Sequence, residues 1–223
     1  MVETIPVFVG FDPREAIAYH VCCQSIIERA SVPVAFHPLH LGLLRQYKET
    51  HGDGSNAFIY SRFLIPWMMG FSGHAIFVDG DMIVKADIAE LWAERDLYSA
   101  VKVVKHDYKT KHPIKYLGAR NDDYPRKNWS SVMLWSCGSA RNRVLTPSYV
   151  EKATGPHLHR FEWLDDDRIG ELPPEWNHLV LESPDADAKL NHYTVGTPCF
   201  PEYANAERSD EWWAEYRKAI APC

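Results

Sequence analysis

The sequence predicts an α/β domain built on parallel strands, and two observations support this fold class. Residues 5–9 form a short apolar run that ends at Gly10, a helical stretch follows from Asp12, and a second apolar run covers residues 34–39. A strand, a helix and a strand at this spacing are typical of a βαβ unit, which joins parallel strands. Residues 75–78 form a continuous apolar run, as expected for a strand that is buried on both faces.

The first helix has a clear start signal. Asp12 is a good N-cap, Pro13 fits the first helical position, and Glu15 stands three residues after the cap. We expect this helix to run to about Arg29. Its inward-facing residues should be Ala16, Tyr19, Cys23, Ile26 and Ile27.

The rest of the chain alternates between short elements and one long loop. Helical patterns cover residues 61–69 with a kink at Pro66, 88–92, 147–153 and, as an amphipathic terminal helix, 209–220. Strand patterns cover 98–104, 131–135 and 179–181. Residues 105–127 are polar and basic without apolar periodicity, and loops of that length are often lids or binding loops.

Composition excludes several classes of protein. The chain has 223 residues with 46% hydrophobic residues and a net charge of −6, so it can bury a core but lacks a broad basic face for nucleic acid. No apolar run is long enough to span a membrane, and residues 1–4 lack the basic start of a signal peptide. The five cysteines, Cys223 among them, lack metal-ligand spacing, which favours a reduced, cytoplasmic setting.

Asp79 and Asp81 follow the apolar run of residues 75–78, with Gly80 between them. Two carboxylates held this close repel one another, so they favour a divalent, oxygen-preferring ion such as Mg²⁺ or Mn²⁺. His192 offers an imidazole that would suit Mn²⁺ better. A strand-end turn with solvated acids, and a structural role for His192, stay open.

The carboxyl ends of parallel strands meet in one crevice, where ligands bind in open α/β sheets. Val9, Gly10, Phe11 and Asp12 end the first strand, and Asp79 follows a later one. The first group suits a nucleobase and ribose, and a metal at the second suits a diphosphate.

Six stretches in this order resemble GT-A glycosyltransferases, and most of all glycosyltransferase family 8, the glycogenin and bacterial lipooligosaccharide galactosyltransferase group. They are residues 9–12, 60–66, 77–83, 128–135, 172–177 and 191–194, so that the resemblance covers roughly residues 5–200. It implies a GT-A domain over residues 1–200, with a mixed, mostly parallel central sheet flanked by helices. Residues 201–223 would be an amphipathic helical extension.

The resemblance also implies a function and its residues. Asp79, Asp81 and His192 would hold Mn²⁺ or Mg²⁺, while Val9 to Asp12, Gly80, Arg62 and Ser130 would contact a nucleotide sugar, most simply a UDP-hexose. Transfer would proceed with retention of configuration, to a glycan, lipid-linked or small-molecule acceptor. Further expectations are a bacterial source, a cytoplasmic location with peripheral attachment to the inner face of the membrane left open, and homo-oligomerisation left open.

The chain departs from the family at two places. Asp165 and Asp166 stand where the family has aspartate and glutamine, so we expect catalytic roles for both. The resemblance of residues 60–66 implies a catalytic role for Arg62 as well. Thr197 stands where the family has a lysine for the leaving diphosphate. The substitute cation is then expected among nearby basic residues: Lys105, Lys109, Lys111, Lys115, Arg126, Lys127, His157, His159, Arg160 and Lys189.

Two other functions stay open. A haloacid-dehalogenase-type phosphatase would use Asp79 as nucleophile and Asp81 as general acid, with Mg²⁺ on Asp165 and Asp166. That fold carries its Asp-x-Asp on the opening strand, however, whereas a βαβ unit precedes Asp79 here. Alternatively, a degenerate GT-A domain would bind nucleotide or glycan without turnover.

Overall fold

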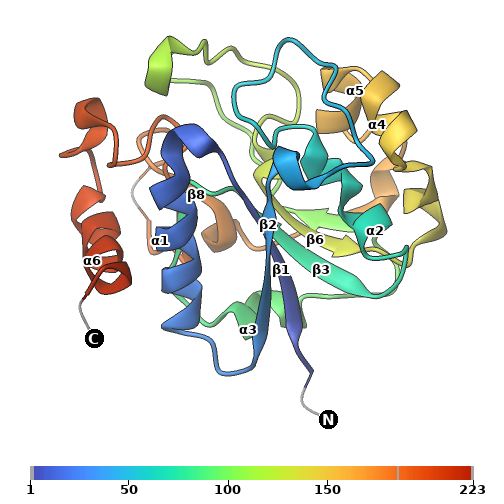
Figure 1. The fold of residues 1–223 in the computed structure, drawn as a ribbon, viewed down its shortest axis with the longest axis horizontal. Helices are drawn as coiled ribbons and strands as arrows, with labels where there is room; N and C mark the ends of the chain where they lie inside the picture. The colour runs from blue at the N-terminus through green and yellow to red at the C-terminus, as the bar shows by residue number, and fades with distance from the viewer. Residues whose placement is uncertain (1–2, 185, 222–223) are drawn as a thin grey trace.

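The computed structural model of the chain describes residues 3–184 and 186–221, so Cys223 lies outside the described residues. A six-stranded sheet forms the centre, with the strand order β2-β1-β3-β6-β5-β7 (Figure 1). Its strands are β1 (Ile5–Gly10), β2 (Val34–Leu39), β3 (His74–Val78), β5 (Val101–Val103), β6 (Val132–Ser136) and β7 (Ile169–Glu171).

The central sheet is mixed and mostly parallel, as predicted. β1 pairs in parallel with β2 and β3, and β5 pairs in parallel with β7. β6 runs antiparallel to both of its neighbours, β3 and β5. A second sheet joins β4 (Met82–Val84), β9 (Leu190–His192) and β8 (His178–Leu179), so β8 is shorter than the predicted strand at 179–181.

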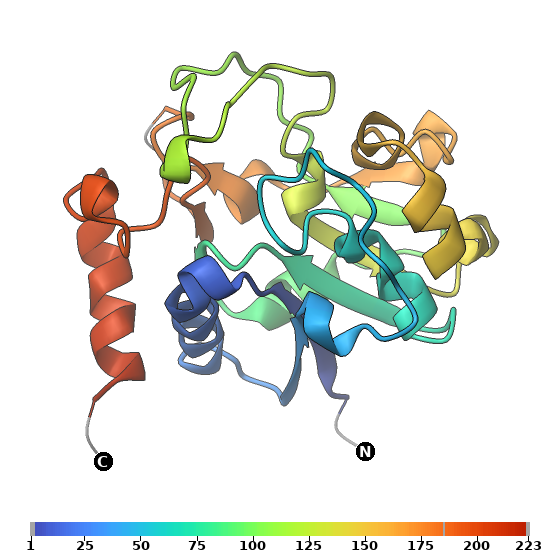
Figure 2. The ribbon, with the colours of Figure 1, turned by 45° about the horizontal axis from the view of Figure 1, so that its top comes forward.

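The carboxyl ends of β1 and β3 meet at one edge of the sheet. All residues of β3 after His74 are buried, which agrees with the continuous apolar run at 75–78. Two long segments, residues 40–60 and 105–127, lie over this edge on the side away from the N-terminus (Figure 2). Loops and strand ends therefore enclose one region of the molecule.

Helix α1 (Ala16–Ile27) follows a short 3₁₀ turn at Pro13–Glu15, and Asp12 caps that turn by accepting from the backbone N–H of Arg14. The predicted inward face is wrong in part. Its buried residues are Ala18, Val21, Cys22, Ser25 and Ile26, whereas the side chain of Ile27 is 58% exposed. The α-helix begins only at Ala16, after the 3₁₀ turn, and it packs mainly against β4 and the terminal helix.

The remaining helices are short. They are α2 (Ile65–Met68), α3 (Ile88–Ala93), α4 (Pro147–Lys152), α5 (Gly155–His159) and α6 (Ser209–Ala219). Instead of kinking one continuous helix, Pro66 lies in the first turn of α2, directly after a 3₁₀ turn at Ser61–Leu64. Within the described part of the chain, no helix combines the length and the apolar character needed to cross a membrane.

The terminal helix α6 packs beside α1, and Figure 1 shows the two helices side by side. Trp212 is fully buried in a cluster with Val21, Ile83, Val180 and Tyr193. Two ion pairs border this contact, Arg29 with Glu215 at 2.7 Å and Lys218 with Glu28 at 3.1 Å. The division into a domain at 1–200 and an extension at 201–223 stays a prediction.

We predict that Trp212 contributes strongly to folding. Trp212→Ala should lower the free energy of unfolding by about 3–5 kcal/mol, since it removes a large buried ring. The predicted helix included Ile220, but α6 ends at Ala219 and the side chain of Ile220 is 55% exposed. Ile220→Ala is the matched control and should change the free energy of unfolding by less than about 0.5 kcal/mol. Urea denaturation measures both variants, and equal effects would contradict the docking of α6.

Candidate metal and nucleotide site

Asp79, Asp81 and His192 converge on one point at the end of β3. Each offers a ligand atom, and these atoms all lie within 4.8 Å of one another. Nε2 of His192 lies 3.4 Å from Oδ1 of Asp81 and 3.8 Å from Oδ2 of Asp79. All three residues are buried, so this is not a turn with solvated acids.

Backbone pairing holds His192 in place. β4 follows Asp81 directly and runs antiparallel to β9, with Met82 opposite His192. The backbone N–H of Tyr193 donates to the carbonyl of Asp81 at 3.0 Å. Nδ1 of His192 lies 3.1 Å from Oδ1 of Asn177, which leaves Nε2 directed at the carboxylates. Such a partner on the second ring nitrogen is typical of histidines that bind metals.

The two carboxylates have different electrostatic surroundings. Arg62 pairs with Asp79 at 2.8 Å between Nη1 and Oδ1, yet burial dominates and raises the pKa of Asp79 to about 6. Burial opposes ionisation of Asp81, but His192 and Lys115 together hold the pKa of Asp81 below its ordinary value. Oδ1 of Asp81 is buried without a hydrogen-bond partner among the described residues. Two carboxylates and an imidazole are a donor set that fits Mn²⁺.

Gly80 allows the ends of β1 and β3 to approach each other closely. A Cβ atom at Gly80 would lie 2.3 Å from the carbonyl oxygen of Gly10. A Cβ atom at Gly10 would in turn meet the ring of Phe58 at 2.3 Å. The glycines therefore bring the two strand ends together, as expected for one shared crevice.

The predicted nucleobase segment lies beside the cluster of Asp79, Asp81 and His192. Val9 is buried in the core, and Phe11 makes edge contacts with the rings of Tyr19 and His40. Asp12 accepts from the backbone N–H of Ala57 at 3.0 Å. Neither Val9, Gly10, Phe11 nor Asp12 is among the described residues that line the cavity around Asp79, so their contact with nucleotide stays a prediction.

A polar chain links Asp79 to His159. The Nη1 atom of Arg62 that pairs with Asp79 also donates to the carbonyl of Ser130 at 2.9 Å. Oγ of Ser130 lies 2.8 Å from Nδ1 of His159. All four residues line the same cavity, which places the predicted Arg62 and Ser130 at the site.

Asp165 and Asp166 lie elsewhere. Their side chains are 74% and 83% exposed, and they pair with Arg141 at 3.2 Å and Arg126 at 2.6 Å. Neither lines the cavity around Asp79 in the described structure. The structure does not bring these two residues to Asp79, Asp81 and His192. Their catalytic role stays a prediction, and this placement does not favour it.

Of the lysine and arginine residues in the long loop, all of them described in the structure, Lys115 lines the cavity around Asp79. Its ammonium group donates to Oγ1 of Thr194 at 3.1 Å. Thr197 donates to Oε2 of Glu15 at 3.2 Å, and Lys189 pairs with Glu90 at 2.9 Å, away from the cavity. Lys115 is therefore placed to supply the charge that Thr197 does not.

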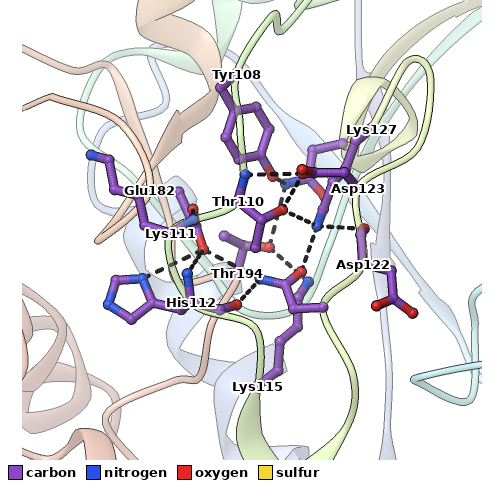
Figure 3. Close-up of polar contacts among 12 residues, drawn as sticks. Tyr108, Thr110, Lys111, His112, Lys115, Asp122, Asp123, Lys127, Glu182 and Thr194 are labelled. Carbon is purple, nitrogen blue, oxygen red and sulfur yellow. Dashed lines mark hydrogen bonds and ion pairs between the residues drawn. The ribbon is translucent and has the colours of Figure 1, made fainter.

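A buried carboxylate anchors the long loop. Glu182 accepts from the backbone N–H groups of Lys111 and His112, and from the side chain of Asn121 (Figure 3). Oδ1 of Asn121 in turn accepts from Lys127 at 2.7 Å. A charge-assisted network of this kind fixes the inner lining of the loop. Closure of the loop over a donor stays a prediction.

Glu15 is a buried group that the sequence reasoning assigned only to a helix start. Its side chain lies near Asp81. Burial, together with the charge of Asp81, raises the pKa of Glu15 to about 8. The capping pattern gave Glu15 a local role, and no sequence signal indicated this long-range one.

Comparison with known structures identifies the fold. The chain superimposes on the bifunctional glycosyltransferase WbbM with a TM-score of 0.63 at 15% identity over 95% of this chain, which corresponds to 51% of WbbM. It superimposes on the galactosyltransferase LgtC, solved with donor and acceptor sugar analogs, with a TM-score of 0.62 at 11% identity over 98% of both chains. For mouse xyloside xylosyltransferase 1 the TM-score is 0.53 at 13% identity, over 86% of this chain and 98% of the other.

The chain thus spans about half the length of WbbM and nearly all of LgtC. The structure has the GT-A glycosyltransferase fold, as the sequence resemblance implied. The phosphatase alternative placed its Asp-x-Asp on the opening strand, which disagrees with the position of β3 after β1 and β2.

No family model matches the chain. It is 42% identical over 219 residues to Protein CDI of Arabidopsis thaliana, covering 94% of this chain and 85% of that protein. The chain belongs to the family of Protein CDI. Because this relative is a plant protein, the expected bacterial source stays a prediction.

We predict that Mn²⁺ binding weakens in acid. Because a metal ligand must be deprotonated and the pKa of Asp79 is raised to about 6, affinity should fall as pH drops below 6, by up to about tenfold per pH unit. Titration with Mn²⁺ followed by electron paramagnetic resonance measures this. Asp87→Asn keeps its helix cap and is the control, while Asp79→Asn should bind weakly at every pH. Constant affinity of the unaltered protein between pH 5 and 7 would contradict the role of Asp79.

Proposed function

We propose that this protein is a metal-dependent, retaining glycosyltransferase that uses a nucleotide sugar, most simply a UDP-hexose. The observation that carries the proposal is the buried cluster of Asp79, Asp81 and His192 at the strand ends of a GT-A fold. LgtC, which shares this fold, forms a complex with donor and acceptor sugar analogs, and this supports a sugar donor here by analogy.

Two residues of the cluster have a supporting partner outside it. Asp79, Asp81 and His192 would hold Mn²⁺ or Mg²⁺, which supplies positive charge beside a diphosphate when bound. Arg62 fixes Asp79, and Asn177 fixes the ring of His192. Lys115 lies in the same cavity, and its ammonium group would stabilise the negative charge that develops on departing UDP.

The donor would lie along the strand ends. In this proposal Val9, Gly10, Phe11 and Asp12 contact the nucleobase and ribose, while Gly80 and Ser130 border the diphosphate and the sugar. The acceptor stays a prediction from the family resemblance, and a cytoplasmic location stays a prediction from the cysteine content. Homo-oligomerisation stays open.

A second candidate function is binding without turnover. Asp165 and Asp166 are exposed and do not line the cavity around Asp79, and this placement favours a domain that holds nucleotide but lacks a carboxylate nucleophile. Calorimetry distinguishes the two candidates, since UDP binding without donor hydrolysis or transfer would favour the binding protein.

We predict that UDP binding depends on Mn²⁺ and on Asp81. A thermal-shift panel of UDP-, GDP- and CMP-sugars should show stabilisation by UDP-sugars only when Mn²⁺ is present, because the ion links carboxylates to diphosphate. Asp81→Asn should abolish this shift while the protein stays folded. Asp122→Asn, at an exposed loop carboxylate, is the control. A shift of equal size in Asp81→Asn would contradict the metal site.

We also predict that Lys115 acts on the leaving group. Lys115→Gln should lower the rate of UDP release by about 10²-fold, as expected when one preorganised positive charge is removed from the transition state. Lys111→Gln is the matched control, because Lys111 is an exposed lysine of the same loop. Release of UDP at an unchanged rate from Lys115→Gln would assign the missing charge to another group.

A further inference from the structure

A second cavity of about 360 Å³ lies beside the candidate metal and nucleotide site. The two cavities share five lining residues, Ser55, Ile59, Lys115, Tyr124 and His159. The second cavity lies between the 105–127 loop and the start of α5, and we call it the loop cavity. A molecule in the loop cavity would therefore reach the group bound beside Asp79.

The loop cavity carries an excess of positive charge. Its charged lining residues are Asp53, Lys115, Arg120, Asp122, Lys127 and Arg160. Arg120 and Asp122 pair with each other at 2.9 Å and cancel, and Asp53 accepts from the hydroxyl of Tyr60 at 2.6 Å. Lys115 also faces the carboxylates of Asp79 and Asp81. Lys127 and Arg160 then remain against the one carboxylate of Asp53, and cations with reduced access to water favour an anionic partner.

Arg160 has free hydrogen-bonding capacity. Its Nε atom is shielded from solvent and has no hydrogen-bond partner among the described residues. Its ion-pair contact is a long one of 3.7 Å to Glu162, a carboxylate that also faces His157 at 3.3 Å. The backbone is fixed, because the carbonyl of Arg160 accepts from Arg126. A guanidinium group in this state suits a phosphate or a carboxylate, which it can bind through two parallel hydrogen bonds.

Lys127 adds charge without an ion pair in the described structure. Its ammonium group donates to Oγ1 of Thr110, Oδ1 of Asn121 and the carbonyl of Asp122, at 2.7–2.9 Å (Figure 3). All three acceptors are uncharged. Burial lowers the pKa of Lys127 to about 8, so the side chain still carries a positive charge at pH 7 in the wall of the loop cavity. No carboxylate of the described residues lies within ion-pair distance of it.

His159 stands where the two cavities meet. Burial lowers the pKa of His159 to about 3, so the ring is neutral at pH 7. Its Nε2 atom is buried without a hydrogen-bond partner in the described part of the chain, while Nδ1 is engaged by Ser130. A neutral imidazole nitrogen suits a sugar hydroxyl, and Tyr60 and Tyr124 add aromatic side chains to the same wall.

We propose that the loop cavity binds the acceptor, and that this acceptor is a sugar bearing an anionic group, either a phosphate or a carboxylate. This inference rests on the proposed function. The anionic group lies against Arg160, and a hydroxyl of the sugar lies near His159 and faces the donor. In the transfer, that hydroxyl oxygen bonds to the anomeric carbon of the donor. The bond from this carbon to the diphosphate breaks with its electron pair on UDP, and the hydroxyl proton passes to UDP.

Calorimetry with glucose, glucose 6-phosphate and glucuronate tests the binding part without metal or donor. At least one anionic sugar should bind about tenfold more tightly than glucose, because hydrogen bonds to a charged group are stronger than those between neutral groups. Added salt should weaken that preference. Tighter binding of glucose 6-phosphate would indicate a phosphate as the anionic group, and tighter binding of glucuronate would indicate a carboxylate. Equal affinity for all three sugars, or no binding of either anionic sugar at millimolar concentrations, would overturn the proposal.

Variants of Arg160 locate the site. Arg160→Gln should remove the preference for the anionic sugar, whereas Arg160→Lys should retain part of it. Arg141→Gln is the matched control, because Arg141 is a partly exposed arginine that pairs with Asp165 and does not line the loop cavity. An anionic preference that persists in Arg160→Gln would overturn the assignment.

Release of UDP from a UDP-sugar in the presence of each sugar tests the link to transfer. Stimulation by the anionic sugar, lost in Arg160→Gln, supports the acceptor site. Binding of the anionic sugar with no release of UDP under any condition would contradict the acceptor role and the proposed function together. Transfer to glucose that equals transfer to the anionic sugar would contradict only the inference about the loop cavity.

Discussion

The burial of two neighbouring carboxylates, Asp79 and Asp81, is the constraint on which the rest of the site depends. Two buried carboxylates separated by a single residue would destabilise the folded protein without compensating charges. The structure compensates with groups from distant parts of the chain: Arg62 from the turn before α2, His192 from β9, and Lys115 from the long loop. The compensation is incomplete, because the pKa of Asp79 remains raised. That residual cost is what a divalent cation would relieve.

The two sheets divide the work of building this site. The central sheet brings the ends of β1 and β3 together, and Gly10 and Gly80 permit their close approach. The smaller sheet then places His192 opposite Met82, directly after the second aspartate. Because each side chain is set by backbone pairing, the ligand atoms converge without any local sequence relation between Asp81 and His192.

The 105–127 loop is held by polar contacts and by the buried ring of Tyr116, which stacks on Phe200. Glu182 accepts hydrogen bonds from two backbone N–H groups and from the side chain of Asn121. Lys127 donates to neutral acceptors. Such a network orders a polar segment and leaves its cations facing the cavities. One loop thereby borders both the candidate metal and nucleotide site and the loop cavity, so the two ligands of a transfer reaction would meet beneath it.

The sequence by itself determined the local features: the α/β class, the end of β3 at Asp79, the cap at Asp12 and the helix at 209–219. These depend on neighbouring residues, so periodicity and capping reveal them. The family resemblance added His192 as a metal ligand. Tertiary structure decided the rest. It buried Trp212 but exposed Ile220, selected Lys115 among many basic residues, and left Asp165 and Asp166 at the surface. Those outcomes depend on which distant element packs against each residue, and no local pattern encodes that.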